Sequence, residues 1–433
     1  MRGVVVFIGV SLVAVSCNGA VDPSCAGGAT WCHGKCVATD IDPKNCGRCG
    51  MACAAGELCS SGACATICQP GYTACDSHCA KLDTDPTDCG VCGHACDGDH
   101  AVPTCVNGAC APACLSTFGD CDSSPDNGCE TDLATTGTSC GKCGHDCLGG
   151  DCVKGMCQPV PLSLHEGYPA ELAMDATTVF WVAWERGTVR SCAKSGCNGM
   201  PTTLAKLQYY PLRIAIDAKN VYWVAGGNIL ECAKGGCNET PTILASGQDP
   251  SSSITSDGAN VYWQVQDGSI MKCAVAGCGG VPTTLASASD SALGAIATDG
   301  KDVFWTTSSE TASCPVTGGT PTVITKTSGQ AVALDGMNLY ATGNGTWTCP
   351  KSGCTTPTKL ASDNGWGIAV DATDVYWTRK DNGTVVRCAK TGCNDTPTVL
   401  VTGQSSPFGI AVDDTAIYFA DYYFNAPVMR LAK

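Results

Sequence analysis

The stretch GIAVDATDVYWTRKDNGTVVRCAKTGCNDTPTVLV, residues 367–401, contains four short runs rich in β-branched and aromatic residues, separated by Gly, Asn, Asp and Pro. Runs bounded by such turn-forming residues predict four short strands. A short run ending in aspartate, followed by an aromatic pair, recurs six times, and a seventh copy has Tyr340-Ala341 in place of the pair. Successive aspartates are 36 to 42 residues apart. These are Asp175, Asp217, Asp257, Asp299, Asp335, Asp371 and Asp413. This period, with four strands per unit, predicts an all-β fold with a seven-bladed β-propeller over residues 158–433.

The two ends of this array indicate how the ring closes. The seventh unit stops at Lys433 after its third strand, whereas residues 159–165 resemble a fourth strand without a unit of its own. We expect this strand to complete the last blade. The repeated phrase resembles the YWTD and NHL-like propellers across residues 158–433.

The N-terminus predicts export. The whole chain of 433 residues contains 36 cysteines, which favours an oxidising compartment. Residues 1–16 carry Arg2 and a short apolar run typical of a signal peptide. The small residues before Cys17 resemble a bacterial lipobox, which implies a diacylglycerol on Cys17 and a tether over 17–24. The alternative is ordinary signal cleavage nearby. We expect a location in the cell envelope, as an outer-membrane lipoprotein or a secreted protein.

Residues 25–157 contain three eight-cysteine repeats, 25–64, 68–110 and 114–157, which share a C-G-x-C-G-x-x-C core. Units this short bury little apolar surface, so we expect four disulfides in each, with the pairing left open. Zinc is the alternative for C-x-x-C pairs. The repeats resemble cysteine-rich modules of myxobacterial envelope and secreted proteins, which implies a spacer role.

Short cysteine rings recur inside the propeller. The C-A-K-x-G-C motif and its variants predict five hairpin disulfides, Cys192–Cys197, Cys232–Cys237, Cys273–Cys278, Cys349–Cys354 and Cys388–Cys393. Cys314 lacks its partner because Gly319 stands in that place, so we expect a buried free thiol.

Charge and metal-ligand patterns limit the possible partners. The net charge of −15 argues against nucleic acid, and we expect membrane contact through the lipid anchor only. No cofactor is expected. Calcium is possible at the acidic residues Asp120, Asp122, Asp126, Glu130 and Asp132, although their spacing does not match an EF-hand and solvated turns are the alternative.

Catalysis is disfavoured by the distribution of histidine. The last histidine is His165, so nothing after residue 165 can serve as an imidazole base, and we expect no catalytic residue and no enzymatic activity. One alternative is a metal-dependent lactonase or hydrolase that resembles gluconolactonase. It would use acids at positions that do not repeat, namely Glu171, Asp249, Asp290, Glu310, Asp363 and Asp381.

Binding is the function that the loops favour. One propeller face should carry the loops between blades and those between second and third strands, and there the units diverge. Their aromatic residues are candidate contacts for a protein or glycan partner at the cell surface. The candidates are Tyr168, Trp184, Tyr209, Tyr210, Trp366, Phe408, Tyr422 and Tyr423, with Phe424 beside them. A purely structural envelope protein is the remaining alternative.

Overall fold

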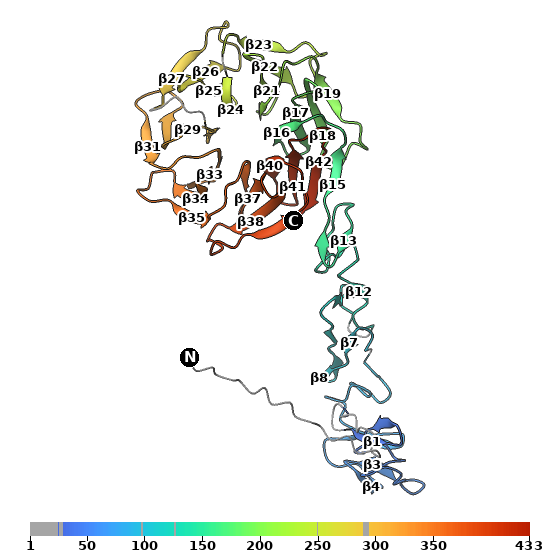
Figure 1. Ribbon diagram of the computed structural model, residues 1–433. Helices are drawn as coiled ribbons and strands as arrows, with labels where there is room; N and C mark the ends of the chain where they lie inside the picture. The colour runs from blue at the N-terminus through green and yellow to red at the C-terminus, as the bar shows by residue number, and fades with distance from the viewer. Residues whose placement is uncertain (1–24, 26–28, 97, 125–126, 249, 289–293) are drawn as a thin grey trace, which may run out of the picture. The chain divides into compact units, whose positions relative to one another are not determined.

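The computed structural model describes residues 25, 29–96, 98–124, 127–248, 250–288 and 294–433 (Figure 1). Their regular structure is all β, which confirms the predicted class. The chain divides into two compact units, Met1–Leu133 and Ala134–Lys433, so that the boundary falls inside the third cysteine-rich repeat. The expected signal peptide 1–16, lipidated Cys17 and tether 17–24 lie outside the described residues. The described residues contain no helix with the length and hydropathy needed to span a bilayer.

The second unit contains a propeller of seven four-stranded antiparallel sheets, formed by the described residues from Val160 onward (Figure 1). In order, the strands are β16 (Pro169–Met174), β17 (Thr178–Ala183), β18 (Thr188–Ala193), β19 (Thr202–Ala205); β20 (Arg213–Ile216), β21 (Asn220–Ala225), β22 (Asn228–Ala233), β23 (Thr242–Ala245); β24 (Pro250–Ser256), β25 (Asn260–Val265), β26 (Ser269–Ala274), β27 (Thr283–Ser287); β28 (Ile296–Thr298), β29 (Asp302–Thr306), β30 (Thr311–Pro315), β31 (Thr322–Thr325). They continue as β32 (Ala331–Leu334), β33 (Asn338–Gly343), β34 (Gly345–Pro350), β35 (Thr358–Ala361); β36 (Ile368–Val370), β37 (Asp374–Arg379), β38 (Thr384–Ala389), β39 (Thr398–Val401); and β40 (Pro407–Val412), β41 (Ala416–Asp421), β42 (Val428–Ala432) with β15 (Val160–Ser163).

The ring closes as predicted. β15 pairs antiparallel with β42, with Val160 opposite Arg430, and so supplies the fourth strand of the last sheet. The first strand of each sheet contacts the first strand of the next, and β16 contacts β40 to complete the circle. Two strands far apart in sequence therefore hold the ring together.

The repeated aspartate has the structural role expected of a turn residue. Asp175 Oδ1 accepts the backbone N–H groups of Thr177 and Thr178, each at 2.9 Å. Asp335 Oδ1 does the same for Met337 and Asn338. A carboxylate that satisfies two turn amides fixes the hairpin between the first and second strands.

The aromatic pairs form the core between sheets. Five tryptophans, Trp181, Trp223, Trp263, Trp305 and Trp377, are fully buried. Trp263 lies in one cluster with Tyr222 of the preceding sheet, and Trp377 lies in one cluster with Tyr340. Each such contact joins two neighbouring sheets, so the dipeptide repeat packs the ring from within.

In five sheets the lysine that follows the third strand forms an ionic tie to an aspartate of the preceding sheet. The ties are Lys194–Asp413, Lys234–Asp175, Lys351–Asp299, Lys390–Asp335 and Lys433–Asp371. In each, the ammonium also lies over an aromatic ring of the preceding sheet, as Lys234 does 5.5 Å from the Phe180 centroid. Val275 and Val316 stand in the lysine position at the other two junctions, those of Asp217 and Asp257.

The five predicted hairpin disulfides of the propeller are all present. Cys314 is a buried free thiol, and its Sγ lies 3.4 Å from the Gly319 carbonyl oxygen. Burial raises the pKa of this thiol, and Asp302 adds to the effect. Cys314 is therefore protonated at neutral pH and has the character of a small core residue.

The cysteine-rich repeats contain short strand pairs and one four-stranded sheet. The strands are β1 (Thr30–Cys32), β2 (Lys35–Val37), β3 (Leu58–Ser60), β4 (Ala63–Ala65), β5 (Thr73–Cys75), β6 (His78–Ala80), β7 (Ala101–Val102), β8 (Cys105–Val106), β9 (Ala109–Cys110), β10 (Ala113–Cys114), β11 (Phe118–Gly119), β12 (Thr131–Asp132), β13 (Cys152–Val153) and β14 (Met156–Cys157). Strands of two or three residues bury almost nothing by themselves, so another interaction must hold each repeat together.

Disulfides supply that interaction. Every cysteine from Cys25 to Cys157 is disulfide-bonded, so none of these sulfurs is a free thiolate for zinc. The first repeat pairs Cys25–Cys36, Cys32–Cys49, Cys46–Cys59 and Cys53–Cys64, and the second follows the same order with Cys68–Cys79, Cys75–Cys92, Cys89–Cys105 and Cys96–Cys110. The third repeat contains Cys114–Cys129, Cys140–Cys152 and Cys147–Cys157.

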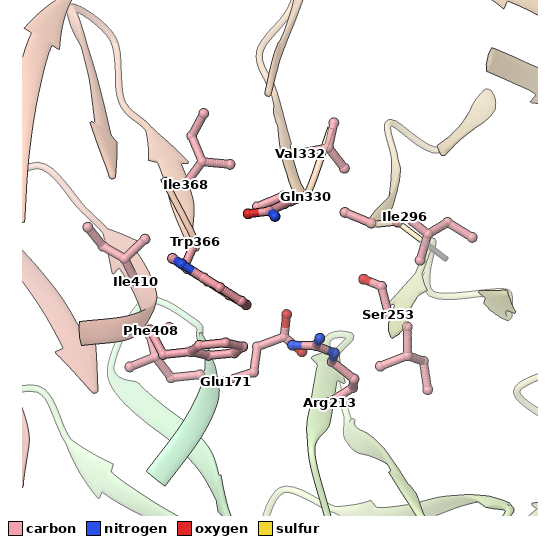
Figure 2. Close-up of a pocket in the computed structure, with 17 residues that line it drawn as sticks. Glu171, Arg213, Ser253, Ile296, Gln330, Val332, Trp366, Ile368, Phe408 and Ile410 are labelled. Carbon is pink, nitrogen blue, oxygen red and sulfur yellow. The ribbon is translucent and has the colours of Figure 1, made fainter. Parts of the chain in front are cut away.

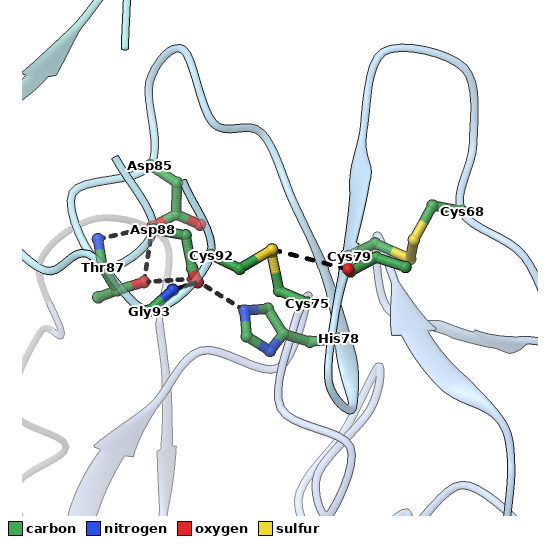
Figure 3. The surroundings of a disulfide bond; sticks show 10 residues. Cys68, Cys75, His78, Cys79, Asp85, Thr87, Asp88, Cys92 and Gly93 are labelled. Carbon is green, nitrogen blue, oxygen red and sulfur yellow. Dashed lines mark hydrogen bonds and ion pairs between the residues drawn. A yellow bond between two sulfur atoms is a disulfide. The ribbon is translucent and has the colours of Figure 1, made fainter. Parts of the chain in front are cut away.

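A polar side chain caps the C-G-x-C-G turn of each repeat. In the second repeat, buried Asp88 accepts the Gly93 N–H at 2.8 Å and contacts His78 Nε2 at 2.8 Å, beside the Cys75–Cys92 disulfide (Figure 3). Burial opposes ionisation of Asp88, but these hydrogen bonds outweigh it and lower its pKa. Asn45 and Ser139 cap the same turn in the first and third repeats.

Candidate ligand-binding face and channel

The predicted aromatic candidates meet on one face of the propeller. Trp366 precedes β36, Phe408 lies in β40, and Tyr422 follows β41. Their ring centroids are 5.7 Å apart for Trp366 and Phe408, and 5.5 Å apart for Phe408 and Tyr422. Three aromatic residues from two neighbouring sheets thus form a continuous surface.

The same surface continues into the next sheets along the ring. Tyr422 contacts Tyr168 at 5.4 Å and Trp184 at 6.5 Å, and Trp184 stacks on Tyr210 at 4.4 Å. Tyr209 and Phe424 extend it at either side. We call this set the aromatic belt: Tyr168, Trp184, Tyr209, Tyr210, Trp366, Phe408, Tyr422 and Phe424. Seven of the eight predicted residues belong to it.

Tyr423 is the one predicted residue whose ring lies outside the belt. Its backbone oxygen accepts the Tyr168 N–H at 3.1 Å, and its own side chain is exposed. Among the described residues, no ring contact joins Tyr423 to the belt. Its contribution to the face is therefore to position Tyr168.

The belt is held by a constrained backbone. Tyr168 and Tyr210 have φ values of 57° and 50°, a region that bulky residues occupy rarely and at a cost. Backbone hydrogen bonds from Tyr168 to Tyr423 and from Trp184 to Tyr168 fix this conformation. Tyr209, Tyr210 and Phe424 nevertheless remain about half exposed or more. An apolar surface that is fixed and also exposed is typical of a binding site.

A cavity of about 320 Å³ opens at the centre of the same ring of first strands (Figure 2). Its wall includes Glu171 of β16, Arg213 of β20, Ser253 of β24, Gln330 beside β32, and the belt residues Trp366 and Phe408. This volume falls in the range of about 300–1,000 Å³ usual for small-molecule sites. The belt and the cavity thus share Trp366 and Phe408.

Glu171 and Arg213 supply the charge on the cavity wall. Glu171 Oε2 accepts the Ile214 N–H at 2.9 Å. Burial raises the pKa of Glu171, although Arg213 and this hydrogen bond oppose the change. The Arg213 guanidinium lies 5.5 Å from the Phe408 centroid, and its Nε is buried without a hydrogen-bond partner among the described residues.

The acids considered for a lactonase-like metal site are dispersed. Glu171 is the one carboxylate on the cavity wall within the described chain. Glu310 pairs with Lys326, Asp363 pairs with Arg379 and accepts the Trp377 indole N–H, and Asp381 is exposed. Asp249 and Asp290 lie outside the described residues.

The acidic stretch of the third repeat brings Asp120, Asp122 and Glu130 together, with one ligand oxygen of each within 4.8 Å of the others. These carboxylates accept backbone N–H groups of Ser124 and Cys121, as acidic turns do. Asp126 lies outside the described residues. The cluster is explained by turn hydrogen bonds.

Sequence reasoning did not identify Arg213, Ser253 and Gln330 as cavity residues. For Arg213 and Ser253 the signal was nevertheless present, because the residue four before each repeated aspartate lies on the cavity wall. Around the ring this position is Glu171, Arg213, Ser253, Ala295, Ala331, Gly367 and Gly409. A position that varies within an otherwise regular repeat faces the channel.

Comparisons with known proteins match two parts of the chain. Residues 10–66 match the stigma-specific STIG1-like protein family. No curated protein sequence matches the chain at a significant level.

Solved structures match the propeller. Virginiamycin B lyase from Staphylococcus aureus superimposes with a TM-score of 0.54 at 15% identity, over 64% of this chain and 98% of that one. A histidine-to-alanine variant of that lyase with quinupristin, described as catalytically inactive, gives 0.53 at 15% identity over 64% and 98%. The WD40 β-propeller domain of Doa1 gives 0.50 at 14% identity over 64% and 97%. At these identities, the likeness shows the propeller fold alone.

Proposed function

We propose that this chain is a non-catalytic binding protein of the cell envelope, in which the propeller recognises a protein or glycan partner through the aromatic belt. The cysteine-rich repeats then serve as a protease-resistant spacer, and a lipid on Cys17 is the proposed anchor. The observation that carries the proposal is the unbroken ring-to-ring contact from Trp366 to Tyr209. Exposed aromatic clusters on rigid scaffolds supply most of the binding energy in many interfaces.

A propeller fold does not by itself decide between catalysis and binding, so the choice depends on this chain's own residues. The sequence has no histidine after His165. No residue after His165 can therefore supply an imidazole like that of the histidine whose replacement accompanies inactivity in the lyase. This supports binding over lyase chemistry.

A metal-dependent hydrolase receives less support from the described wall. Divalent cations in such sites take several oxygen ligands. Glu171 is the one carboxylate that the described cavity residues offer. Metal analysis of the purified full chain after dialysis against trace calcium and zinc tests this alternative, and one tightly held ion per chain would favour it.

The decisive experiment measures saturable binding of envelope components to the full chain with its disulfides intact. The Tyr210→Ala, Phe424→Ala double variant removes two exposed belt rings. We expect it to bind the captured component at least roughly tenfold more weakly, since hot-spot truncations cost 2 kcal/mol or more. Tyr72→Ala, an exposed tyrosine in the cysteine-rich unit, is the matched control.

Equal binding by the belt variant and the control would show that the belt is not the binding surface. The absence of any saturable component would favour a purely structural envelope protein. Either result would overturn the proposed function.

A further inference from the structure

The cavity wall has a polar part and an aromatic part. The residues four before the repeated aspartates are Glu171, Arg213 and Ser253 in three consecutive sheets, and alanine or glycine in the remaining four. Where that residue is glycine, the residue before it is Trp366 or Phe408. Figure 2 shows Glu171 and Arg213 beside the Phe408 ring, with Ser253 on the other side of the cavity. The residue four before each aspartate and the residue preceding it thus give the cavity a polar part and an aromatic part.

The polar part offers hydrogen-bonding groups of both kinds. Ionised Glu171 accepts only, and one of its two oxygens is occupied by the Ile214 N–H. Arg213 donates only, and its buried Nε–H has no partner among the described residues. A buried donor left unpaired costs about 1–3 kcal/mol, which a ligand acceptor would recover.

The aromatic part is fixed by close approach of the backbone. A Cβ on Gly367 would lie 2.2 Å from the Phe408 carbonyl oxygen, and one on Gly409 would lie 2.5 Å from the Ala170 carbonyl oxygen. Only glycine fits at these points, so the strands that carry Trp366 and Phe408 come close together. The two rings are 37° from parallel and form one apolar wall.

The charges decide which ligand fits. A carboxylate or phosphate would be attracted to Arg213 but repelled by Glu171, and an ammonium would experience the reverse. A hydroxyl both donates and accepts, so neighbouring hydroxyls satisfy Glu171 and Arg213 together. A sugar ring carries such hydroxyls at its edge and presents an apolar C–H face that can lie on Trp366 or Phe408.

We infer that the central cavity is a saccharide site in which one sugar ring stacks on Trp366 while its hydroxyls reach Glu171 and Arg213, whose guanidinium lies against Phe408. The inference rests on the proposed function, because it names a glycan as the ligand of that face. It adds that the central cavity, and not the exposed part of the belt, selects the sugar. The remaining belt rings would contact the rest of the glycan.

The test uses the full chain and four probes, the methyl glycosides of glucose, galactose, mannose and N-acetylglucosamine. Saturation-transfer NMR reports direct contact, and tryptophan fluorescence reports stacking on Trp366. We expect saturation transfer to the ring C–H protons of at least one glycoside, with a fluorescence change that Trp366→Phe abolishes. Acetate and methylammonium are tested beside them as purely ionic probes.

Two conservative variants identify the polar groups. Glu171→Gln keeps an acceptor for Ile214 but removes the charge, and Arg213→Lys keeps the charge but removes the Nε–H. Each should weaken glycoside binding roughly tenfold, the effect of losing a charge-assisted hydrogen bond. Met337→Ala, at an exposed turn remote from the cavity wall, should bind as the wild type does.

Failure of all four glycosides to bind would overturn the inference, and so would binding of acetate or methylammonium without any glycoside. Wild-type affinity in both Glu171→Gln and Arg213→Lys would also overturn it. Belt-dependent capture of an envelope component in the same preparation separates the two proposals. If capture persists, only the saccharide site is wrong; if capture is absent as well, both are.

Discussion

The cysteine-rich unit and the propeller reach stability by different means. Among the described residues up to Leu133, the buried hydrophobic positions other than cysteine are Val37 and Ala80. The propeller instead buries five tryptophans between its sheets and ties five junctions by lysine and aspartate. A short repeat cannot bury enough surface and uses covalent links, whereas a ring of sheets forms a core at every junction.

Reduction of the disulfides should distinguish the two regions most clearly. Each disulfide contributes roughly 2–4 kcal/mol, and the cysteine-rich unit has little else to replace it. We expect a reductant to expose residues 29–133 to protease while residues 160–433 stay protected, as measured by limited proteolysis and mass spectrometry. Simultaneous cleavage of both regions would show that the propeller also depends on its hairpin disulfides.

Truncation of a core tryptophan should have the next largest effect on stability. Trp377 is fully buried and donates its indole N–H to Asp363 at 3.0 Å. Trp377→Ala should lower the free energy of unfolding by about 3–5 kcal/mol in urea titrations. Trp366→Ala, which truncates a partly exposed ring on the cavity, is the comparison and should cost much less. A similar loss in both variants would contradict the assignment of Trp377 to the core.

The ionic ties should give a smaller effect that depends on pH. Burial opposes ionisation of Asp175, but hydrogen bonds from Lys234 and the turn amides outweigh it and lower its pKa to about 2. The pKa of Asp413 is likewise lowered to about 2, with Lys194 as its partner. Because these folded pKa values lie below the unfolded value of about 3.9, the stabilisation is present above pH 4 and disappears as the pH falls toward 2.

Lys234→Met keeps the aliphatic stem and removes the charge from this tie. We expect a loss of about 1 kcal/mol at pH 7, since the pair is partly exposed. The difference from the wild type should shrink between pH 4 and 2, as followed by urea midpoints. A difference that is constant over this range would assign the effect to packing of the side chain.

Completing a missing tie should give the smallest effect. Val275→Lys places an ammonium where five other sheets carry a lysine, near Asp217 and Tyr222. We expect a gain of about 0.5 kcal/mol, visible as a small rise in Tm, whereas Val275→Met should give none. A loss of stability in the lysine variant alone would mean that the valine contact with the core matters more than the charge.

The local repeat explains why so much of the architecture follows from sequence. The repeat of an aspartate, a turn and an aromatic residue defines the hairpin, the core residues and the repeat length together. The four strands of residues 367–401, the closure by β15 and the five hairpin disulfide rings are therefore all present. The aromatic candidates also meet, since loops of the same kind in a ring of equivalent sheets must lie on one face. The ionic ties were not predicted, because they join residues about 50 or more positions apart.

The sequence by itself determined the repeating unit, the oxidised cysteines and the kind of residue available for binding, because each depends on patterns within some forty residues. Only the tertiary structure decided which of these residues share a site. Glu171, Arg213, Trp366 and Phe408 come from four sheets, and closure of the ring brings them to one cavity. Their contact depends on non-local strand packing, which the order of residues along the chain does not reveal.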